Sequence, residues 1–481
     1  MTLSAEIPLE IIGSIIDLVR NDQKTLRNCA LTSRFLAHRS QKWLFARVKL
    51  EFPPPSLDPA VAHIERFIEI LNPKIASYIN HLFINNYAQY TVAANTYHGE
   101  DTFLAQILPK LEKIQSLSIC LIFYGGDMRS NQFSPALASL FIDTLASTEA
   151  VEVNIGRFDV FPVNLLASCC PCIKRLDFFD CFVRAPLIFG SLHMQELAPP
   201  KLDLRSSTGP RYLERLAVSD STSGRMLLDA TSLPNAVLSL ERLWELEIRS
   251  IAMAQVVLDI MATSGRHLRR LICHFKEDLL GLLIKSQDLP PLLLLPTLRA
   301  LCASIAFLRS PTPHFKWLRS ALQASAVSCS TNSLEEFVLL VSSDEFLTNF
   351  DPTSTWDAHA EEYHALDLAL SGRGYPHLRR VVIFVQFKKS GFQLDEHLME
   401  PVLYFETLVH GLKTQLPLLC AKGILDVRWL VDETADEKFN RSTLHMAIQA
   451  VEEGIEGPVY VGTDGEFLKF GLLTDETRDA I

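Results

Sequence analysis

Apolar and polar positions repeat along most of the chain in one short pattern. An apolar residue is followed by two of any kind, an apolar residue, one of any kind and another apolar residue. Apolar residues two apart are typical of a strand that buries one face. The pattern begins at eleven places, in steps of 23 to 46 residues that average 34.5. We predict strands at residues 79–84, 114–119, 150–155, 173–178, 213–218, 243–248, 268–273, 298–303, 334–339, 378–383 and 424–429.

Amphipathic stretches with helical spacing lie between several of these strands. A strand–helix unit that recurs at such an interval cannot bury its apolar face alone, so neighbouring units must stack. Any single match is weak because apolar alternation is common, and the prediction depends on the recurrence. Helices are expected at Asp101–Leu111, Pro135–Leu145, Ile251–Ala262, His314–Val327 and His359–Leu370.

The N-terminal segment has the periodicity of helices. Residues 7–20 place Ile11, Ile15 and Leu18 in one apolar stripe with a second stripe beside it. Asp22 and Ser33 are suited to cap a second and a third short helix. The first helix is apolar over more than half its circumference, which is more than two short neighbours can cover. The surplus is therefore expected to pack on the rest of the chain or on a partner.

This segment, IPLEIIGSIIDLVRNDQKTLRNCALTSRFLAHRSQKWLF, resembles the F-box. The start at residues 8–12, the middle at 29–34 and the aromatic end at 43–45 fit the family's pattern without a gap, with mild departures at Ile7 and Thr32. The resemblance implies docking onto the Skp adaptor of a cullin-based, SCF-type ubiquitin ligase. The alternative is an ordinary helical cap on the following repeats. The residues implied to lie at or behind the adaptor contact are Pro8, Ile11, Ile12, Ile15, Leu26, Leu31 and Trp43.

The repeating pattern resembles the leucine-rich repeat, in the irregular variety that often follows an F-box in fungal proteins. The resemblance implies an α/β fold, in which a small three-helix F-box module precedes a leucine-rich-repeat-like solenoid with a parallel concave sheet and helices on the convex side. The Asn or Cys expected shortly after each strand is mostly absent, so the chain departs from the regular repeat. The expected parts are the module (1–50), a proline-rich linker (51–60), the solenoid (61–430) and an acidic C-terminal cap (431–481).

One face of such a sheet is a candidate binding surface. The first, fourth and sixth pattern positions would face the core, and the third, the fifth and the residue after the sixth would face the open concave side. A mixed-charge strip with aromatics there suits a protein or peptide partner. The alternative is a set of solvated strand faces without a partner. The strip comprises Arg175, Asp177, Phe179, Glu245, Glu247, Arg249, Arg270, His274, Asp426 and Arg428.

Composition and charge narrow the classes of protein. Apolar residues make up 48% and charged residues 21%, which permits a large core. Residues 431–481 hold twelve acidic and four basic side chains, a balance of −8 within the net charge of −11. No Lys/Arg cluster that would indicate nucleic-acid binding is evident. Without a recognisable secretory signal or membrane-spanning stretch, and with ten scattered cysteines, the chain is expected in the cytoplasm or nucleus, with no membrane partner.

No enzyme motif is evident in the sequence. P-loop, Gly-x-Gly-x-x-Gly and Gly-x-Ser-x-Gly patterns are absent. Cys169-x-x-Cys172 has zinc-like spacing but lacks a second ligand pair, which favours buried thiols. His359 and His364 are five residues apart and do not share a helix face. We therefore predict no catalytic residue, no metal and no cofactor. The two glycines within residues 461–466 indicate a hairpin turn there.

The predicted function is that of a substrate-recruiting subunit of an SCF-type ubiquitin ligase. Residues 7–45 would bind the Skp adaptor, and the solenoid would bind an unidentified target protein. One alternative is an F-box-bearing scaffold without a role in degradation. Another is an enzyme whose active site lies in the loops and carries no recognisable motif.

Overall fold

The structure is a computed structural model of the 481-residue chain. The chain forms two compact units, Met1–Leu240 and Glu241–Ile481, called here the N-terminal and C-terminal units. The described residues are 9–20, 22–52, 58–89, 98–124, 135–148, 150–156, 163–179, 211–219, 221–234, 236–249, 254–274, 296–306, 313–328, 332–342, 360–388, 401–432, 443–455, 459–461 and 467–468.

Three short helices open the N-terminal unit: α1 (Leu9–Leu18), α2 (Gln23–Thr32) and α3 (Arg34–Leu44). Asp22 caps α2 by accepting a hydrogen bond from the Thr25 N–H at 3.0 Å. Ser33 caps α3 in the same way, accepting from the Leu36 N–H at 3.2 Å. The three helices and both capping residues are confirmed.

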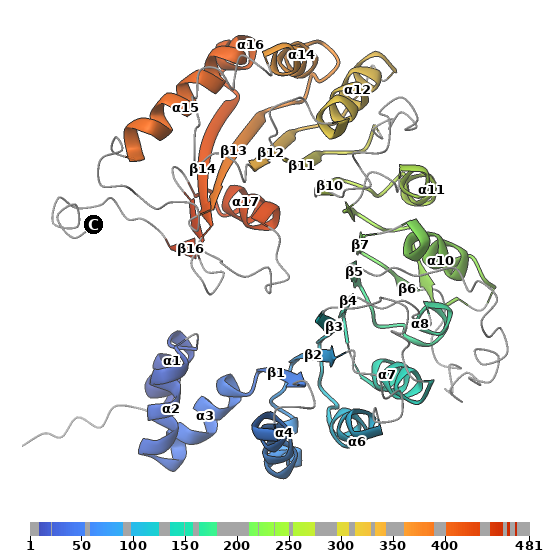
Figure 1. Ribbon diagram of the computed structural model, residues 1–481, viewed down its shortest axis with the longest axis vertical. Coiled ribbons are helices and arrows are strands. Elements are labelled where there is room, and N and C mark those ends of the chain that lie inside the picture. Colours follow the sequence, from blue (N-terminus) through green and yellow to red (C-terminus); the bar gives the residue numbers. More distant parts are fainter. Residues whose placement is uncertain are drawn as a thin grey trace, which may run out of the picture. The chain divides into compact units, whose positions relative to one another are not determined.

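Parallel strands in sequence order follow these helices (Figure 1). They are β1 (Arg47–Phe52), β2 (His81–Gln89), β3 (Ser116–Tyr124), β4 (Glu152–Gly156), β5 (Arg175–Phe179) and β7 (Arg215–Val218), while β6 (Arg211–Tyr212) and β8 (Leu238–Ser239) pair separately. Between them lie α4 (Asp58–Ile70), α5 (Pro73–Ala76), α6 (His98–Ile107), η1 (Leu108–Lys110), α7 (Pro135–Ser147), α8 (Val163–Cys169) and α10 (Ser221–Thr231). The helices α4, α6, α7, α8 and α10 lie along one side of the strands.

The C-terminal unit repeats this arrangement and adds one helix on the other side of its sheet (Figure 1). Its strands are β9 (Glu245–Ile248), β10 (Arg270–His274), β11 (Ala300–Ala306), β12 (Glu336–Ser342), β13 (Arg380–Lys388), β14 (Leu425–Asp432), β15 (Val459–Val461) and β16 (Phe467–Leu468). Its helices are α11 (Ala254–Ser264), α12 (Pro313–Ser328), α14 (Ala360–Ser371), α15 (Pro401–Gln415), α16 (Pro417–Ala421) and α17 (Thr443–Glu452), of which α17 lies opposite the others.

All of these strands are parallel except β16, which pairs with β15 in an antiparallel hairpin. Of the turn predicted at residues 461–466, Val461 is the last residue of β15, and residues 462–466 lie outside the described residues. The predicted α/β class with a parallel sheet is confirmed.

All eleven predicted strands are present, and each begins at or next to the third position of its pattern. The first pattern position is buried in ten of the eleven strands, as at Ile79, Ile114 and Leu334, and is half-buried at Ile424. Backbone hydrogen bonds join neighbouring strands just before the later strand starts. The carbonyl of Asn80, for example, accepts hydrogen bonds from the N–H groups of Gln115 at 2.8 Å and Ser116 at 3.0 Å. The same pairing recurs at most strand entries and fixes the register of these repeats through the main chain.

One strand was not predicted. Strand β1 pairs in register with β2, from Arg47 opposite His81 to Phe52 opposite Asn86. It lies where the end of the helical module and the start of a linker were expected. The segment from Phe45 to Leu50 carries the same apolar pattern as the other strands. The parallel sheet therefore follows directly on α3.

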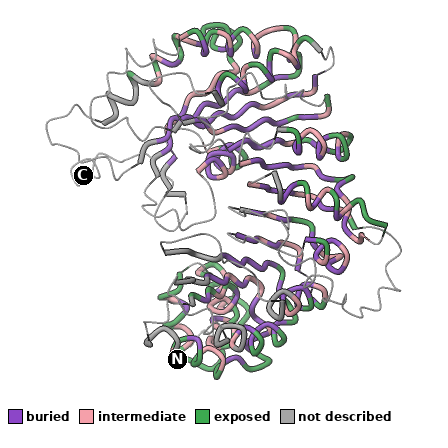
Figure 2. The backbone as a smooth tube through the Cα atoms, turned by 45° about the vertical axis from the view of Figure 1, so that its right-hand side comes forward, coloured by how far each residue is buried: buried purple, intermediate pink, exposed green. Residues whose placement is uncertain are grey.

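The sheet face opposite the outer helices differs between the units. In the N-terminal unit this face carries polar side chains such as Ser118 and Asn154. In the C-terminal unit the middle of this face is apolar, and α17 covers it. The apolar cluster between α17 and the sheet joins Ile272, Cys302, Val338, Leu340, Val382, Phe384 and Leu430 to Leu444, Met446, Ala447, Ile448, Ala450 and Val451 of α17. Figure 2 shows β9 to β13 buried along most of their described length. The segment expected to form a terminal cap thus places a helix on the face that was predicted to be open.

The cover formed by α17 can be tested with one buried and one exposed valine. Val338 lies beneath α17, whereas Val327 on α12 is 89% exposed. Val338→Asp should destabilise the C-terminal unit by on the order of 3–5 kcal/mol, because it buries a carboxylate without a partner. Val327→Asp should change the free energy of unfolding by less than about 0.5 kcal/mol. Urea unfolding of both variants measures the difference, and equal midpoints would contradict the proposed cover.

Candidate adaptor-binding surface and sheet faces

A polar contact holds α1 against α3. The Asp17 carboxylate accepts hydrogen bonds from Arg39 Nε at 2.9 Å, from Arg39 Nη2 and from Trp43 Nε1 at 2.8 Å. Hydrogen bonds from Arg39 and then Trp43 lower the pKa of Asp17 to about 2. A Cβ atom at Gly13 would lie 2.7 Å from Arg39 Nη1, so the glycine leaves room for the guanidinium. The polar edge of Trp43 is therefore occupied within the chain.

The apolar residues of the helical module divide into a covered and an uncovered group. Ile16 and Leu26 are buried, whereas Ile11 and Ile15 are each 51% exposed and Leu31 is 86% exposed. We call the exposed group the N-terminal apolar surface: Leu9, Ile11, Ile15, Leu18, Leu31 and Phe35. Within the described residues, this chain does not bury these side chains.

The residues implied by the F-box resemblance take different positions in this module. Ile11, Ile15 and Leu31 belong to the N-terminal apolar surface. Ile12 and Trp43 are half-buried, and Leu26 is fully buried behind them. Pro8 lies outside the described residues. The set therefore combines solvent-facing positions with positions that support the helices from inside.

The module is attached to the start of the sheet. The His38 ring of α3 meets the Tyr78 ring edge-on, with 5.7 Å between ring centroids. The Ala46 carbonyl, just after α3, accepts hydrogen bonds from the N–H groups of Asn80 and His81, both at 3.0 Å. These contacts join the end of α3 to the residues that precede and begin β2.

In the N-terminal unit the strip predicted to bind a target is partly open to solvent. Arg175 is exposed and lies 3.8 Å from a Glu152 carboxylate oxygen. Asn154 donates to Ser118 Oγ at 2.8 Å, which links neighbouring strands across the face. Asp177 is half-buried, and the Phe179 side chain lies outside the described residues. This face offers polar groups of both charge signs.

In the C-terminal unit the predicted strip is on the expected face but is not open. Glu245 is 2% exposed, Glu247 and His274 are 5% exposed, and Arg428 is 3% exposed. Arg249, Arg270 and Asp426 are also tied into ion pairs on this face. The expectation that this part of the strip faces open solvent is wrong. The reason is that α17 lies over the face and supplies partners for several of these residues.

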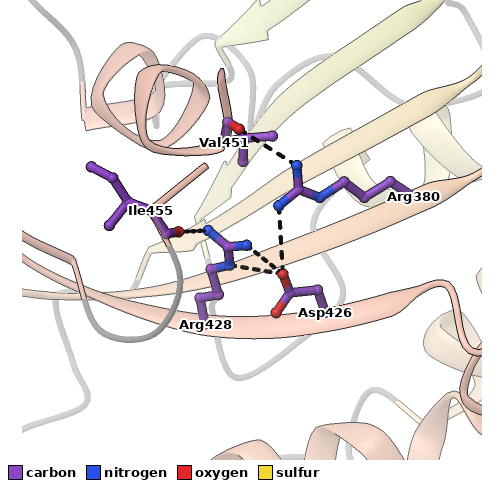
Figure 3. A network of polar contacts seen from close by, with 5 residues as sticks. All are labelled: Arg380, Asp426, Arg428, Val451 and Ile455. Atoms are coloured by element: carbon purple, nitrogen blue, oxygen red, sulfur yellow. Dashed lines mark hydrogen bonds and ion pairs between the residues drawn. The ribbon is translucent and has the colours of Figure 1, made fainter. Parts of the chain in front are cut away.

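The C-terminal end of α17 is held by two arginines from the sheet (Figure 3). Arg380 donates to the Val451 carbonyl at 3.4 Å, and Arg428 donates to the Ile455 carbonyl. Asp426 lies between the two arginines and accepts from Arg428 Nε at 2.8 Å. The backbone turns away from the helix at Gly454, whose φ of 66° favours glycine. Cations at carbonyls that end a helix are favourable, because these carbonyls lack partners within the helix.

A second arginine contact lies nearer β9 and β10. Arg270 contacts Glu245 at 3.2 Å and Glu452 of α17 at 2.6 Å. The N-terminal end of α17 has its own contact, since Thr443 Oγ1 accepts a hydrogen bond from Gln386 of β13 at 3.1 Å. Polar contacts from β10 and β13 therefore reach α17, and one from β14 reaches Ile455 just after it.

Glu247 is the centre of a buried cluster of charged and titratable groups. Its carboxylate lies 2.8 Å from Arg249 Nε, 3.1 Å from His274 Nε2 and 3.0 Å from His445 Nε2 of α17. Burial alone would raise the pKa of Glu247, but the charge of Arg249 and the two imidazoles outweigh it and hold this pKa well below its usual range. Burial lowers the pKa of His274. A buried carboxylate beside two imidazoles can accept hydrogen bonds from them or share a cation with them.

Sequence reasoning placed Glu247 and His274 on the correct face but missed His445, Glu452 and Arg380. A signal for the missing cover was present at the fifth pattern positions. In the N-terminal unit these are Phe83, Ser118, Asn154, Asp177 and Ala217, whereas those of β10 to β13 are Ile272, Cys302, Val338 and Val382. Apolar side chains on both faces of a strand require cover on both faces.

Comparison of the chain with known protein families, with characterised proteins and with solved structures finds no match. Among the described helices, none is both long enough and apolar enough to cross a membrane.

The contact between Asp17 and Arg39 predicts a pH dependence of α1. Asp17→Asn should loosen α1 at pH 7 by no more than about 1 kcal/mol, because the ion pair is partly exposed. The pKa of Asp17 in the folded chain is below the unfolded value of about 3.9. The stabilisation is therefore complete above about pH 4 and is lost as the pH falls towards about 2.

Hydrogen exchange of the α1 amides, compared between wild type and Asp17→Asn at each pH where the chain stays folded, measures this effect. The difference should shrink on acidification. A difference that is the same at pH 7 and at the acid end would show that the carboxylate charge does not hold the helix.

Proposed function

We propose that this chain is an F-box protein that recruits a target protein to an SCF-type ubiquitin ligase and catalyses nothing itself. The observation that carries the proposal is the N-terminal apolar surface. Large apolar side chains on three short, capped helices stay exposed, while other apolar residues of the same helices are buried. Apolar surface of this kind is typical of a contact with another protein. The match of residues 7–45 to the F-box pattern supports the Skp adaptor as that protein.

We propose further that the stacked strand–helix units form a leucine-rich-repeat-like solenoid that holds the target. The parallel strands in sequence order and the repeated backbone pairing at strand entries support this reading. The face of β1 to β7 is the better candidate for target contact, because Arg175 and Glu152 remain accessible there. The face of β9 to β14 is already covered by α17. Holding the target beside the ligase would accelerate ubiquitin transfer through proximity.

Adaptor binding should depend on the exposed isoleucines of α1. Ile11→Asp and Ile15→Asp, singly and together, are expected to weaken binding of purified Skp adaptor at least about 30-fold. This corresponds to the loss of about 2 kcal/mol that is typical of a central apolar contact. Biolayer interferometry of the full chain on immobilised adaptor measures the affinity.

Val327→Asp is the matched control, since it replaces an even more exposed apolar residue outside the helical module. Its affinity for the adaptor should equal that of wild type, and all variants should keep the wild-type unfolding midpoint. Undiminished binding by the Ile11→Asp/Ile15→Asp chain, or no binding by wild type, would refute the F-box assignment.

The same double variant separates a recruiter from a scaffold. In cells, a chain that binds its target but not the adaptor should protect that target from degradation. Quantitative mass spectrometry should therefore find a captured protein whose abundance rises severalfold with Ile11→Asp/Ile15→Asp relative to wild type. The rise should disappear when the proteasome is inhibited in both samples. Captured proteins whose abundance is equal with both chains would favour the scaffold without a degradation role.

A further inference from the structure

Three side chains that can bind a metal converge between α17 and the sheet. Glu247 comes from β9, His274 from the end of β10 and His445 from the first turn of α17. One ligand atom from each lies within 4.8 Å of the others. The two imidazole rings lie 5.4 Å apart between centroids, with their planes tilted by 31°. No second group of this kind is found among the residues that the structure describes.

The identity of the donor atoms favours a transition metal of the zinc type. Two imidazole nitrogens and one carboxylate oxygen form a set used by zinc and related divalent ions, whereas Mg²⁺ and Ca²⁺ prefer oxygen ligands alone. Glu247 and His274 are each 5% exposed, so their donor atoms are held in a site from which water is largely excluded. Three ligands from separate elements leave a fourth position for water, which is typical of zinc bound by three protein side chains.

The spacing of the donor atoms is close to that required. Atoms that share one tetrahedral zinc ion lie roughly 3.4 Å apart, because each bond is about 2.0–2.2 Å long. Both His Nε2 atoms already lie near the carboxylate, at 3.1 Å for His274 and 3.0 Å for His445. Small side-chain rotations would bring all three onto a single ion.

Arg249 defines how the carboxylate would be used. Its Nε donates to Glu247 Oε1 at 2.8 Å, the oxygen that His274 Nε2 also contacts, while His445 contacts the other oxygen, Oε2. A metal would therefore bind through Oε2, His274 would turn from Oε1 towards the ion, and Arg249 would orient the carboxylate through Oε1 from outside the site. Partners of this kind are common around metal ligands and fix their orientation.

We propose that Glu247, His274 and His445 form a binding site for a divalent transition metal of the zinc class, which fastens α17 to the sheet. His445 belongs to the covering helix, whereas Glu247 and His274 belong to the strands beneath it. Binding of one ion therefore closes a link between segments about 170 residues apart in the chain (274 to 445). The inference stands apart from the proposed role in ubiquitin ligation, because all three ligands lie outside the N-terminal helices.

The test uses the purified full chain after removal of metal with EDTA. Titration with ZnCl₂ should show one tightly bound ion per chain by calorimetry and by elemental analysis. The ion should raise the unfolding midpoint of the C-terminal unit and slow hydrogen exchange in residues 443–452. His445→Gln retains a hydrogen-bond donor, but glutamine is a poor zinc ligand. This variant should therefore weaken zinc binding more than about 100-fold. Loss of a residue that only orients a metal ligand costs less, about 10- to 100-fold.

Two further variants separate a metal site from a network of hydrogen bonds. His445→Cys, which offers a thiolate, should keep zinc binding and the zinc-dependent rise in midpoint. His364→Ala, which changes an exposed histidine of α14, should behave as wild type. The proposal is overturned if wild type binds no stoichiometric zinc, if His445→Gln keeps the full zinc response, or if His445→Cys responds no better than His445→Gln. Because His445 is partly exposed, its variants should fold even if a His274 variant does not.

Discussion

A strand in a parallel sheet presents side chains to two faces, and each face must be either covered or polar enough to stay in water. This constraint accounts for the difference between the two units. In the N-terminal unit the face opposite the outer helices carries serine, asparagine and charged side chains, which water can solvate. In the C-terminal unit the equivalent positions of β10 to β13 are apolar, and exposure of Ile272, Val338 and Phe384 together would be unfavourable. The helix α17 meets this requirement from within the same chain.

The polar contacts around α17 fix its position on that apolar face. An apolar face alone would accept a helix in several registers, because hydrophobic contacts have little directionality. Arg380 and Arg428 hold the carbonyls at the end of α17, while Glu247 contacts His445 near its start. A shift of α17 by one turn would remove the contact of Glu247 with His445 and that of Arg428 with the Ile455 carbonyl. Loss of a partner is costly for a buried charge. The buried charges thus specify where the helix lies, and the apolar cluster supplies most of the attraction.

Much of the fold could be predicted from the sequence, and the errors have physical causes. The eleven strands were recognisable because a buried first position and a two-residue alternation recur together. Strand β1 escaped because its pattern starts at Phe45, inside the segment that reads as an F-box. The role of α17 escaped because the acidic balance of residues 431–481 indicated a solvated end. Within Thr443–Glu452 itself, Glu452 is the only acid, and six residues are buried, so the average over the longer segment hid an apolar helix.

The candidate sites were likewise predictable only in part. Alternation along a strand predicts which face a residue occupies, but it does not predict what covers that face. Glu247, His274 and Arg428 were therefore placed correctly and judged wrongly as open. The exposure of Ile11 and Ile15 was predictable from helical periodicity alone, because two short neighbours leave too little surface to bury them. Leu31 was named only through the resemblance to the F-box. The chain thus contains two apolar surfaces of similar origin with different outcomes. It covers the sheet face with its own helix, at a position fixed by paired charges, whereas the helices at the start of the chain carry no comparable cover within the described residues. A second protein can gain binding energy at an apolar surface that the chain leaves uncovered, because no helix of the chain has to be displaced. For this reason adaptor docking is proposed for α1 and not for the sheet face beneath α17.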